Sequence, residues 1–86
     1  MLKYEFSSKA LKQLQKLDHP IQTRLVDKLD EICGNQTLPA DINRLTDSKL
    51  GEYRIRVGNY RIIFDLENDT LVILKVGHRR DIYKNK

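Results

Sequence analysis

Cysteine and histidine are scarce in this chain of 86 residues, which contains one Cys and two His. Cys33 has no second cysteine to pair with, so an internal disulfide is excluded. His19 and His78 lie far apart in the sequence and show none of the short ligand spacings of a zinc site. Cys33 falls on the apolar side of an expected helix and is interpreted as a packing residue. With no glycine-rich phosphate loop either, the sequence predicts neither a metal nor a cofactor.

Long apolar runs are absent as well. No stretch approaches the roughly 20 residues that span a bilayer, and the N-terminus lacks the pattern of a signal peptide. The hydrophobic share is 40%, and its patterning is that of a folded chain with one modest core. We therefore expect a single domain over residues 1–86, located in the cytoplasm, with no membrane partner.

Basic residues outnumber acidic ones, and the excess is unevenly distributed. The net charge is +4 and the sequence pI is near 9.3. Residues 1–51 carry a net charge of +1, whereas residues 52–86 carry +3. A basic surface suits an acidic partner such as nucleic acid, so any such surface is expected in the C-terminal part of the chain.

The first half of the chain has the pattern of a strand followed by two helices. Residues 2–6 alternate between apolar and polar, which is typical of a short strand. Ser7 or Ser8 can cap a first helix, and Asp18-His19-Pro20 provides a stop followed by a second start. The expected apolar faces are Ala10, Leu11, Leu14 and Leu17 in the first helix, and Ile21, Leu25, Leu29, Ile32 and Cys33 in the second. Such closely spaced helices should form an antiparallel hairpin that packs on a sheet.

The second half predicts a loop and then an antiparallel meander of three strands. Gly34 is placed to end the second helix, and residues 35–50 read as a loop with one helical turn near residues 41–45. Residues 53–57 alternate with period two, and Gly58-Asn59 separates them from the next strand by the commonest hairpin loop length. Asn68-Asp69 offers a second turn. The expected order is β-α-α-β-β-β, an α+β domain with a helical hairpin on an antiparallel sheet.

The register of the first hairpin brings arginines together. A two-residue loop places Val57 opposite Tyr60 and therefore Arg56 opposite Arg61, on the same face as Arg54. Like charges opposite each other are destabilising, so the group is either a solvated sheet face or an anion site, since guanidinium forks match phosphate geometry. Arg61 and Arg79 are expected to lie outside the core.

His78 and Tyr83 follow the last expected strand, near Arg79 and Arg80. An imidazole is a suitable proton-transfer group near neutral pH. Tyr83 could stack on a base or merely cover the edge of the sheet. Both residues are therefore candidates for a site, with a structural role as the alternative.

Two segments carry a resemblance to a known family. Residues 53–61, YRIRVGNYR, and residues 76–83, VGHRRDIY, resemble the RelE-type toxins of prokaryotic toxin–antitoxin pairs, whose superfamily also includes the ParE-type toxins. The resemblance extends over essentially the whole chain in length, element order and motif placement. It implies a RelE-like α+β fold and cleavage of messenger RNA in the ribosomal A site. It also implies neutralisation by a co-encoded antitoxin, an acidic and partly disordered chain.

The resemblance further implies roles for individual residues. Arg54 and Arg56 stand where relatives have lysines that activate the 2′-hydroxyl or stabilise charge. Arg61 matches an arginine that holds the scissile phosphate, and Arg79 one on the leaving-group side. The remaining candidates are His78 as a catalytic residue and Arg80 with Tyr83 as substrate-binding residues.

Arginine is effectively never deprotonated, so Arg54 and Arg56 are poor general bases. Either His78 takes that role, or catalysis rests on electrostatics and on positioning by the ribosome. The expected function is thus a metal-independent, ribosome-dependent endoribonuclease whose partners are mRNA, the ribosome and an antitoxin. The alternatives are a ParE-like inhibitor of DNA gyrase and a non-toxic, basic nucleic-acid-binding module.

Overall fold

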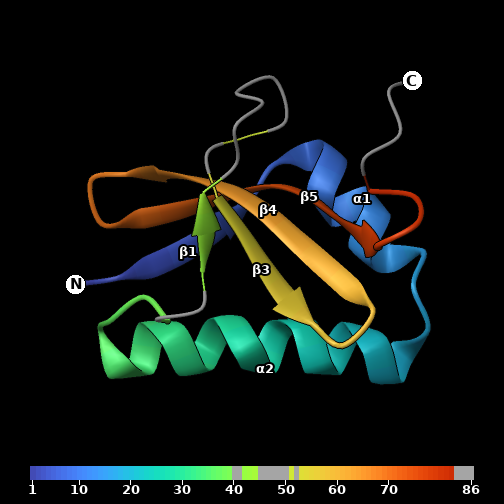
Figure 1. Ribbon diagram of the computed structural model, residues 1–86, viewed down its shortest axis with the longest axis horizontal. Coiled ribbons are helices and arrows are strands. Elements are labelled where there is room, and N and C mark those ends of the chain that lie inside the picture. Colours follow the sequence, from blue (N-terminus) through green and yellow to red (C-terminus); the bar gives the residue numbers. More distant parts are fainter. Residues whose placement is uncertain (40–41, 45–50, 52, 83–86) are drawn as a thin grey trace.

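The computed structural model describes residues 1–39, 42–44, 51 and 53–82. The elements are β1 Lys3–Phe6, α1 Ser8–Gln15, α2 His19–Asn35, β2 Asn43–Arg44, β3 Tyr53–Val57, β4 Tyr60–Glu67 and β5 Thr70–His78. Figure 1 shows α2 running along one side of the sheet, with α1 beside β5. The expected α+β class and the order of its main elements are confirmed.

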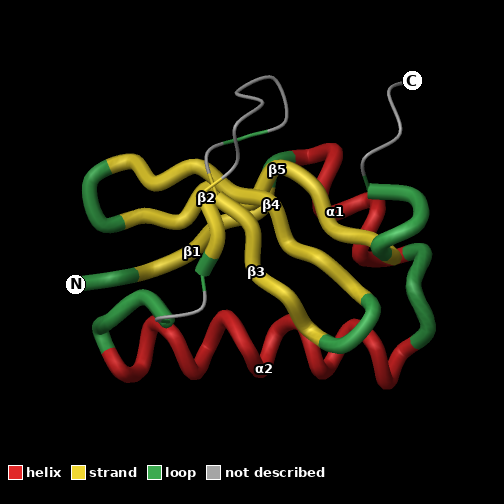
Figure 2. Tube along the Cα trace, in the orientation of Figure 1, coloured by secondary structure: helices red, strands yellow, loops and turns green. Residues whose placement is uncertain are grey.

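The five strands form one sheet in the order β1-β5-β4-β3-β2. β3, β4 and β5 make the expected antiparallel meander. The expectation of a wholly antiparallel sheet is wrong, because β1 pairs with β5 in parallel, with Lys3 opposite Thr70 and Phe6 opposite Ile73. The sequence pattern identifies β1 as a strand but does not say which strand it joins. Figure 2 shows the strands gathered above α2.

A short strand occupies the segment where a helical turn was expected. Asn43 and Arg44 form β2, which pairs antiparallel with β3. The expected turn over residues 41–45 is therefore wrong at its centre, while residues 41 and 45 lie outside the described part. The physical reason is the neighbouring edge of β3, which supplies backbone hydrogen-bonding groups that a strand can pair with and a helical turn cannot.

Local capping explains the bounds of the helices. Ser7 is the N-cap of α1, and its Oγ accepts a hydrogen bond from the backbone N–H of Ala10 at 3.1 Å. Asp18 is the N-cap of α2; its side chain makes no capping hydrogen bond, but its backbone carbonyl accepts from the N–H groups of Ile21 and Gln22, and Pro20 lies in the first turn as expected. Gly34 does not end α2: the helix continues to Asn35, and Gln36 is the C-cap in the left-handed conformation at φ 55°. The Gln36 side chain also holds the start of β1, since its Oε1 accepts from the backbone N–H of Leu2 at 2.6 Å.

Both helices pack on one face of the sheet, α1 against β5 and β1, and α2 against β1 and β3. Their apolar side chains join alternate strand residues such as Ile62 and Phe64 in one core. Phe64 is fully buried and stacks on Tyr53, with the ring centroids 5.4 Å apart. Burying a side chain of this size stabilises the fold by about 1.5–3 kcal/mol. Leu11 was expected in the core, but 43% of it is exposed, because it projects from α1 in a different direction from the buried Ala10 and Leu14.

The face of the sheet away from the helices holds Ile63, which is fully buried although it lies outside the main core. Gly51 crosses this face closely: a Cβ added there would lie 2.6 Å from Cγ2 of Ile63 and 3.1 Å from Cδ1 of Leu74. Its φ is +146°, which L-residues rarely adopt. Gly51 is thus required by both its backbone conformation and its close approach to the sheet.

Two glycines should respond in opposite ways to alanine. Gly51→Ala should lower the free energy of unfolding by about 1–3 kcal/mol, through the strained φ and the overlap with Ile63. Gly34→Ala is the matched control, because Gly34 lies in the last turn of α2 with nothing within 4 Å of an added Cβ. It should raise stability by about 0.4–1 kcal/mol. Urea denaturation of both variants measures the difference, and an equal effect of the two changes would contradict this interpretation.

Candidate nucleic-acid interface

The turn between β3 and β4 sets the arrangement of the candidate site. Val57 lies opposite Tyr60 and Arg56 opposite Arg61, so the expected register is confirmed. Of the two loop residues only Gly58 has positive φ, 61°, which is typical of a turn with glycine at its first central position. Arg54 lies on the same face as Arg56, two residues along the strand. This group, the arginine face, is defined as Arg54, Arg56 and Arg61.

Arg61 is part of the folded hairpin and not a free surface charge. It is 9% exposed, and its Nη1 donates hydrogen bonds to the carbonyl oxygens of Gly58 at 2.9 Å and Tyr60 at 2.8 Å. The expectation that Arg61 lies outside the core is therefore wrong. The turn carbonyls compensate for part of the cost of removing its charge from water. Arg54 is half-buried, and Arg56 is exposed.

Another guanidinium reaches the turn from α2. A Cβ added at Gly58 would lie 2.8 Å from Nη2 of Arg24, so the missing side chain of the glycine leaves space for this arginine. Arg24 is distant in sequence from the hairpin, and no sequence pattern indicated it. It adds positive charge at the tip of the hairpin that carries Arg56 and Arg61.

The residues after β5 fold back against the same tip. The backbone N–H of Arg79 donates to the carbonyl of Asn59 at 2.8 Å. The N–H groups of Asp81 and Ile82 both donate to the carbonyl of His78, which closes a turn. Ile82 is buried and lies beside Gly77: a Cβ added at Gly77 would be 3.6 Å from Cδ1 of Ile82. Arg79, exposed at the start of this turn, is thereby held next to the arginine face.

His78 does not join the arginine face. It lies opposite Tyr60 in the ladder, whereas Arg61 lies opposite Gly77, so the histidine and Arg61 point to opposite faces of the sheet. Its ring packs against that of Tyr60 in a T-shaped arrangement, with the ring centroids 5.3 Å apart. Its Nδ1 accepts a hydrogen bond from the backbone N–H of Arg80 at 3.1 Å, which places the proton of the neutral ring on Nε2. The expected grouping of His78 with the arginines is thus not observed.

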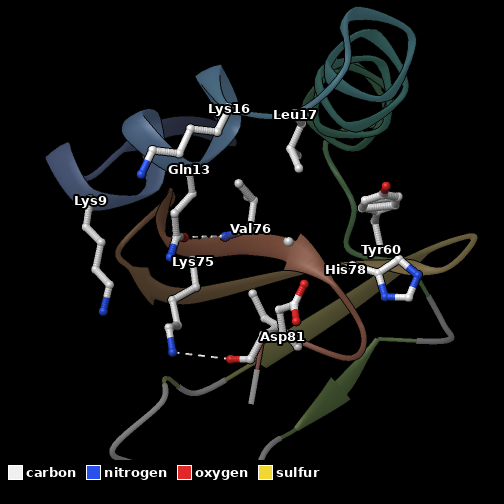
Figure 3. Close-up of a pocket in the computed structure, with 11 residues that line it drawn as sticks. Lys9, Gln13, Lys16, Leu17, Tyr60, Lys75, Val76, His78 and Asp81 are labelled. Atoms are coloured by element: carbon white, nitrogen blue, oxygen red, sulfur yellow. Dashed lines mark hydrogen bonds between the residues drawn. The ribbon is translucent and has the colours of Figure 1, made fainter. Parts of the chain in front are cut away.

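A pocket of about 520 Å³ lies between α1, β5 and the turn that follows β5, and His78 is one of the residues that line it (Figure 3). Three lysines line it: Lys9 of α1, Lys16 at the C-cap of α1, and Lys75 of β5. Burial lowers the pKa of Lys75, and the charge of Lys9 adds to this effect. No sequence motif marked these lysines as a site, although Lys9 and Lys16 are seven residues apart, about two helical turns, and so project in similar directions.

Other kinds of site have little support in the described residues. No group of three or more His, Cys, Asp or Glu side chains there could hold a metal ion. Within the same residues, no helix is long and apolar enough to cross a membrane. Tyr83, proposed to bind substrate, lies outside the described residues.

The fold agrees with comparisons to known proteins. Residues 4–83 match the family described as the ParE toxin of the type II toxin–antitoxin system, parDE. The chain is 34% identical to Toxin RelE3 of Methanocaldococcus jannaschii, over 95% of this chain and 96% of that protein. It is 30% identical to a putative RelE-like toxin protein of Escherichia coli, over 92% of this chain and 86% of that protein.

Solved structures show the same relationship. The RelB–RelE antitoxin–toxin complex from Methanococcus jannaschii contains a chain that is 31% identical, with a TM-score of 0.72, covering 91% of this chain and 93% of that one. The toxin–antitoxin complex RelBE2 from Mycobacterium tuberculosis has a chain that is 25% identical, with a TM-score of 0.76, covering 91% and 98%. These similarities define the class as a toxin of a type II toxin–antitoxin system. The chain belongs to the RelE/ParE toxin family, as its sequence motifs indicated.

Replacing Arg61 should affect stability far more than replacing the arginine opposite it. Arg61→Ala removes a buried donor and leaves the Gly58 and Tyr60 carbonyls without its hydrogen bonds, which should cost about 1–3 kcal/mol. Arg56→Ala removes the same charge from an exposed position and should change stability by less than about 0.5 kcal/mol. Urea denaturation of the two variants tests this, and equal stabilities would mean that the turn does not depend on Arg61.

Proposed function

We propose that this toxin is a ribosome-dependent endoribonuclease that cleaves mRNA in the ribosomal A site and so inhibits translation. The observation that carries the proposal is the arginine face, with Arg61 fixed by the turn carbonyls and Arg79 tied to Asn59 beside it. Arginines placed opposite one another destabilise the fold. Such a cluster is expected where the protein binds a polyanion, because guanidinium groups pair well with phosphates. Likeness to RelE toxins over nearly the whole chain supports RNA as that polyanion.

The chemistry requires no metal. The RNA 2′-hydroxyl attacks the adjacent phosphorus, the bond from phosphorus to the 5′-oxygen breaks, and a cyclic 2′,3′-phosphate and a 5′-hydroxyl result. The 2′-hydroxyl proton is released, and the departing 5′-oxygen takes up a proton. Negative charge builds on the phosphoryl oxygens and on the 5′-oxygen. Guanidinium groups already aimed at these atoms lower the barrier, because they need no reorganisation as the charge develops.

The arginines divide this work by their positions. Arg61, immobilised against its own turn, holds the scissile phosphate, while Arg54 and Arg56 stabilise charge near the 2′-hydroxyl. Arg79, at the start of the C-terminal turn, acts on the leaving-group side. Arg80 and Tyr83 contact the substrate. A site built on the face of a sheet orients a long RNA only weakly, so the ribosome supplies the orientation of the RNA.

His78 has a positioning role in this proposal. Its Nδ1 accepts from the Arg80 N–H, and its carbonyl accepts from Asp81 and Ile82. With its proton on Nε2 and its ring on the other face from Arg61, it lacks the geometry of a general base for the same phosphate. It holds the turn that presents Arg79.

We further propose that a co-encoded antitoxin masks this protein. The RelB–RelE complex from Methanococcus jannaschii is an assembly of a toxin of this fold with its antitoxin. An acidic, partly disordered chain that folds on binding would match the basic surface of the present toxin.

The second candidate function is inhibition of DNA gyrase without nuclease activity. It is favoured by the family match, whose description names the ParE toxin. A translation extract and a gyrase supercoiling assay separate the two candidates: cut mRNA ends with unaffected supercoiling support the first, and the reverse supports the second. RNA binding with neither effect would indicate a non-toxic binding module.

Arg56→Ala and Arg79→Ala should each abolish growth arrest and reduce mRNA cleavage by about 10²–10³-fold, the usual loss for one oxyanion-stabilising donor. Both side chains are exposed, so the thermal melting temperature should stay near that of the wild type. Lys3→Ala, which removes one exposed positive charge from β1, is the control and should keep full activity. Full toxicity in both arginine variants would remove the arginine face as the site.

His78→Gln should keep most of the cleavage activity and the pH profile of the wild type. Glutamine retains a side-chain oxygen that can accept the hydrogen bond from the Arg80 N–H. The measurement is the single-turnover rate on ribosome-bound mRNA between pH 5.5 and 8.5. A loss of about 10²–10⁴-fold, together with loss of the pH dependence, is the result expected for a general base and would overturn the positioning role.

A further inference from the structure

The lysine-lined pocket exists because β5 extends further than its neighbour on one side. β1 ends at Phe6, opposite Ile73, so among the described strands none pairs with the C-terminal half of β5 on that side. α1 covers this edge instead, and Oε1 of Gln13 accepts the hydrogen bond of the Val76 N–H at 3.0 Å. Figure 3 shows Gln13 reaching from α1 to β5, with space left between the helix and the turn after β5.

The described side chains that line this space carry mostly positive charge. Lys9, Lys16 and Lys75 are accompanied by one carboxylate, Asp81. Lys9 and Lys16 are exposed, so their amines are free to turn toward a ligand at little cost. Three amines around one hollow with a single carboxylate leave it electropositive, which favours an anionic occupant.

The surroundings of Lys75 show the same excess of positive charge. Its Nζ donates to the carbonyl of Ile82 at 3.2 Å, so the amine is fixed in the pocket wall. Its pKa is lowered, first by burial and then by the positive charge of Lys9. An anion in the pocket would relieve this repulsion and stabilise the charged amine.

We propose that this pocket binds a phosphate group of an RNA strand, with Lys9, Lys16 and Lys75 as its cationic contacts. The ring of Tyr60 and the imidazole of His78 form the opposite wall. They offer an aromatic surface on which a nucleotide base can stack. A phosphate beside a stacking surface matches a nucleotide better than it matches a free inorganic anion.

This inference rests on the proposed function and deepens it, since it gives the same RNA a second contact. The turn of residues 79–82 contributes to both the arginine face and the lysine-lined pocket. Arg79 lies at its start, next to the arginine face, and Asp81 and Ile82 line the pocket. A strand that crosses this turn can therefore contact both sites. The pocket then contributes affinity and register, whereas the arginine face carries the chemistry.

The test compares two double variants of equal net charge. Lys9→Gln/Lys16→Gln removes two pocket lysines, and Lys3→Gln/Lys12→Gln removes two exposed lysines that do not line the pocket. The probe is a fluorescein-labelled 12-nucleotide 2′-O-methyl RNA, which lacks the attacking hydroxyl and is not cleaved. Fluorescence anisotropy from 50 to 200 mM salt gives the affinity and its salt dependence, and thermal melting confirms folding of both variants.

The pocket variant should bind about two- to thirtyfold more weakly than the wild type, as expected when two exposed ion pairs are removed. Its slope of log affinity against log salt should be smaller by about 0.7 for each phosphate that the protein no longer neutralises. The control variant should show less than half of this weakening. In the wild type, RNA should shift the NMR signals of the Val76 amide and the Gln13 side-chain amide.

Equal binding by the two double variants, or no binding of this RNA by the wild type at 50 mM salt, would overturn the inference. So would unchanged RNA binding combined with weaker binding of an acidic antitoxin peptide, which would assign the pocket to a protein partner. The outcome is separate from that of the proposed function, because the probe is not cleaved. If the pocket variant binds RNA more weakly but the wild type cleaves no mRNA, the proposed endoribonuclease function is refuted, whereas the proposed RNA-binding role of the pocket is supported.

Discussion

The hydrogen bonds of Arg61 to the carbonyls of its own turn are the interaction on which the basic surface depends. They brace the two-residue loop that joins β3 to β4, beside the pair in which Arg56 lies opposite Arg61. The Asn59 carbonyl of the same loop then accepts from the Arg79 N–H, which fixes the direction in which the chain leaves β5. Both cationic segments that resemble RelE toxins are thus joined at one turn.

In the proposed function, this arrangement lowers the stability of the fold and favours the binding of an anion. A guanidinium that is largely buried and faces a second arginine is unfavourable for folding unless its donors are satisfied. The turn carbonyls satisfy part of this need and hold the group where a phosphate would meet it. Because the side chain is already ordered, little conformational entropy remains to be lost when the anion binds.

The parallel pairing of β1 has consequences at the other edge of the molecule. Because β1 is short, it leaves half of β5 to α1, and a glutamine takes the place of a strand as the hydrogen-bond partner of Val76. The same geometry brings Lys9 and Lys16 into one pocket with Lys75 and His78. The turn after β5 lies between the two basic regions, so a change in that turn affects both.

The sequence by itself determined the parts that depend on neighbours along the chain. Period-two alternation and a two-residue loop were enough to predict β3, β4 and the pairing of Arg56 with Arg61, because a loop of that length permits one register. Helical spacing and capping residues predicted α1 and the start of α2. Residues 53–61 and 76–83 carried the resemblance to the RelE toxins that the comparisons confirm.

Only the tertiary structure decided what depends on contacts between distant segments. The partner of β1, the burial of Arg61, the face to which His78 points and the grouping of lysines from α1 and β5 all followed from the packing of elements far apart in sequence. No local pattern records these choices, since the same helix or strand pattern is compatible with several neighbours. Burial is a property of the whole fold, because a side chain such as that of Arg61 loses its water only when other segments close around it.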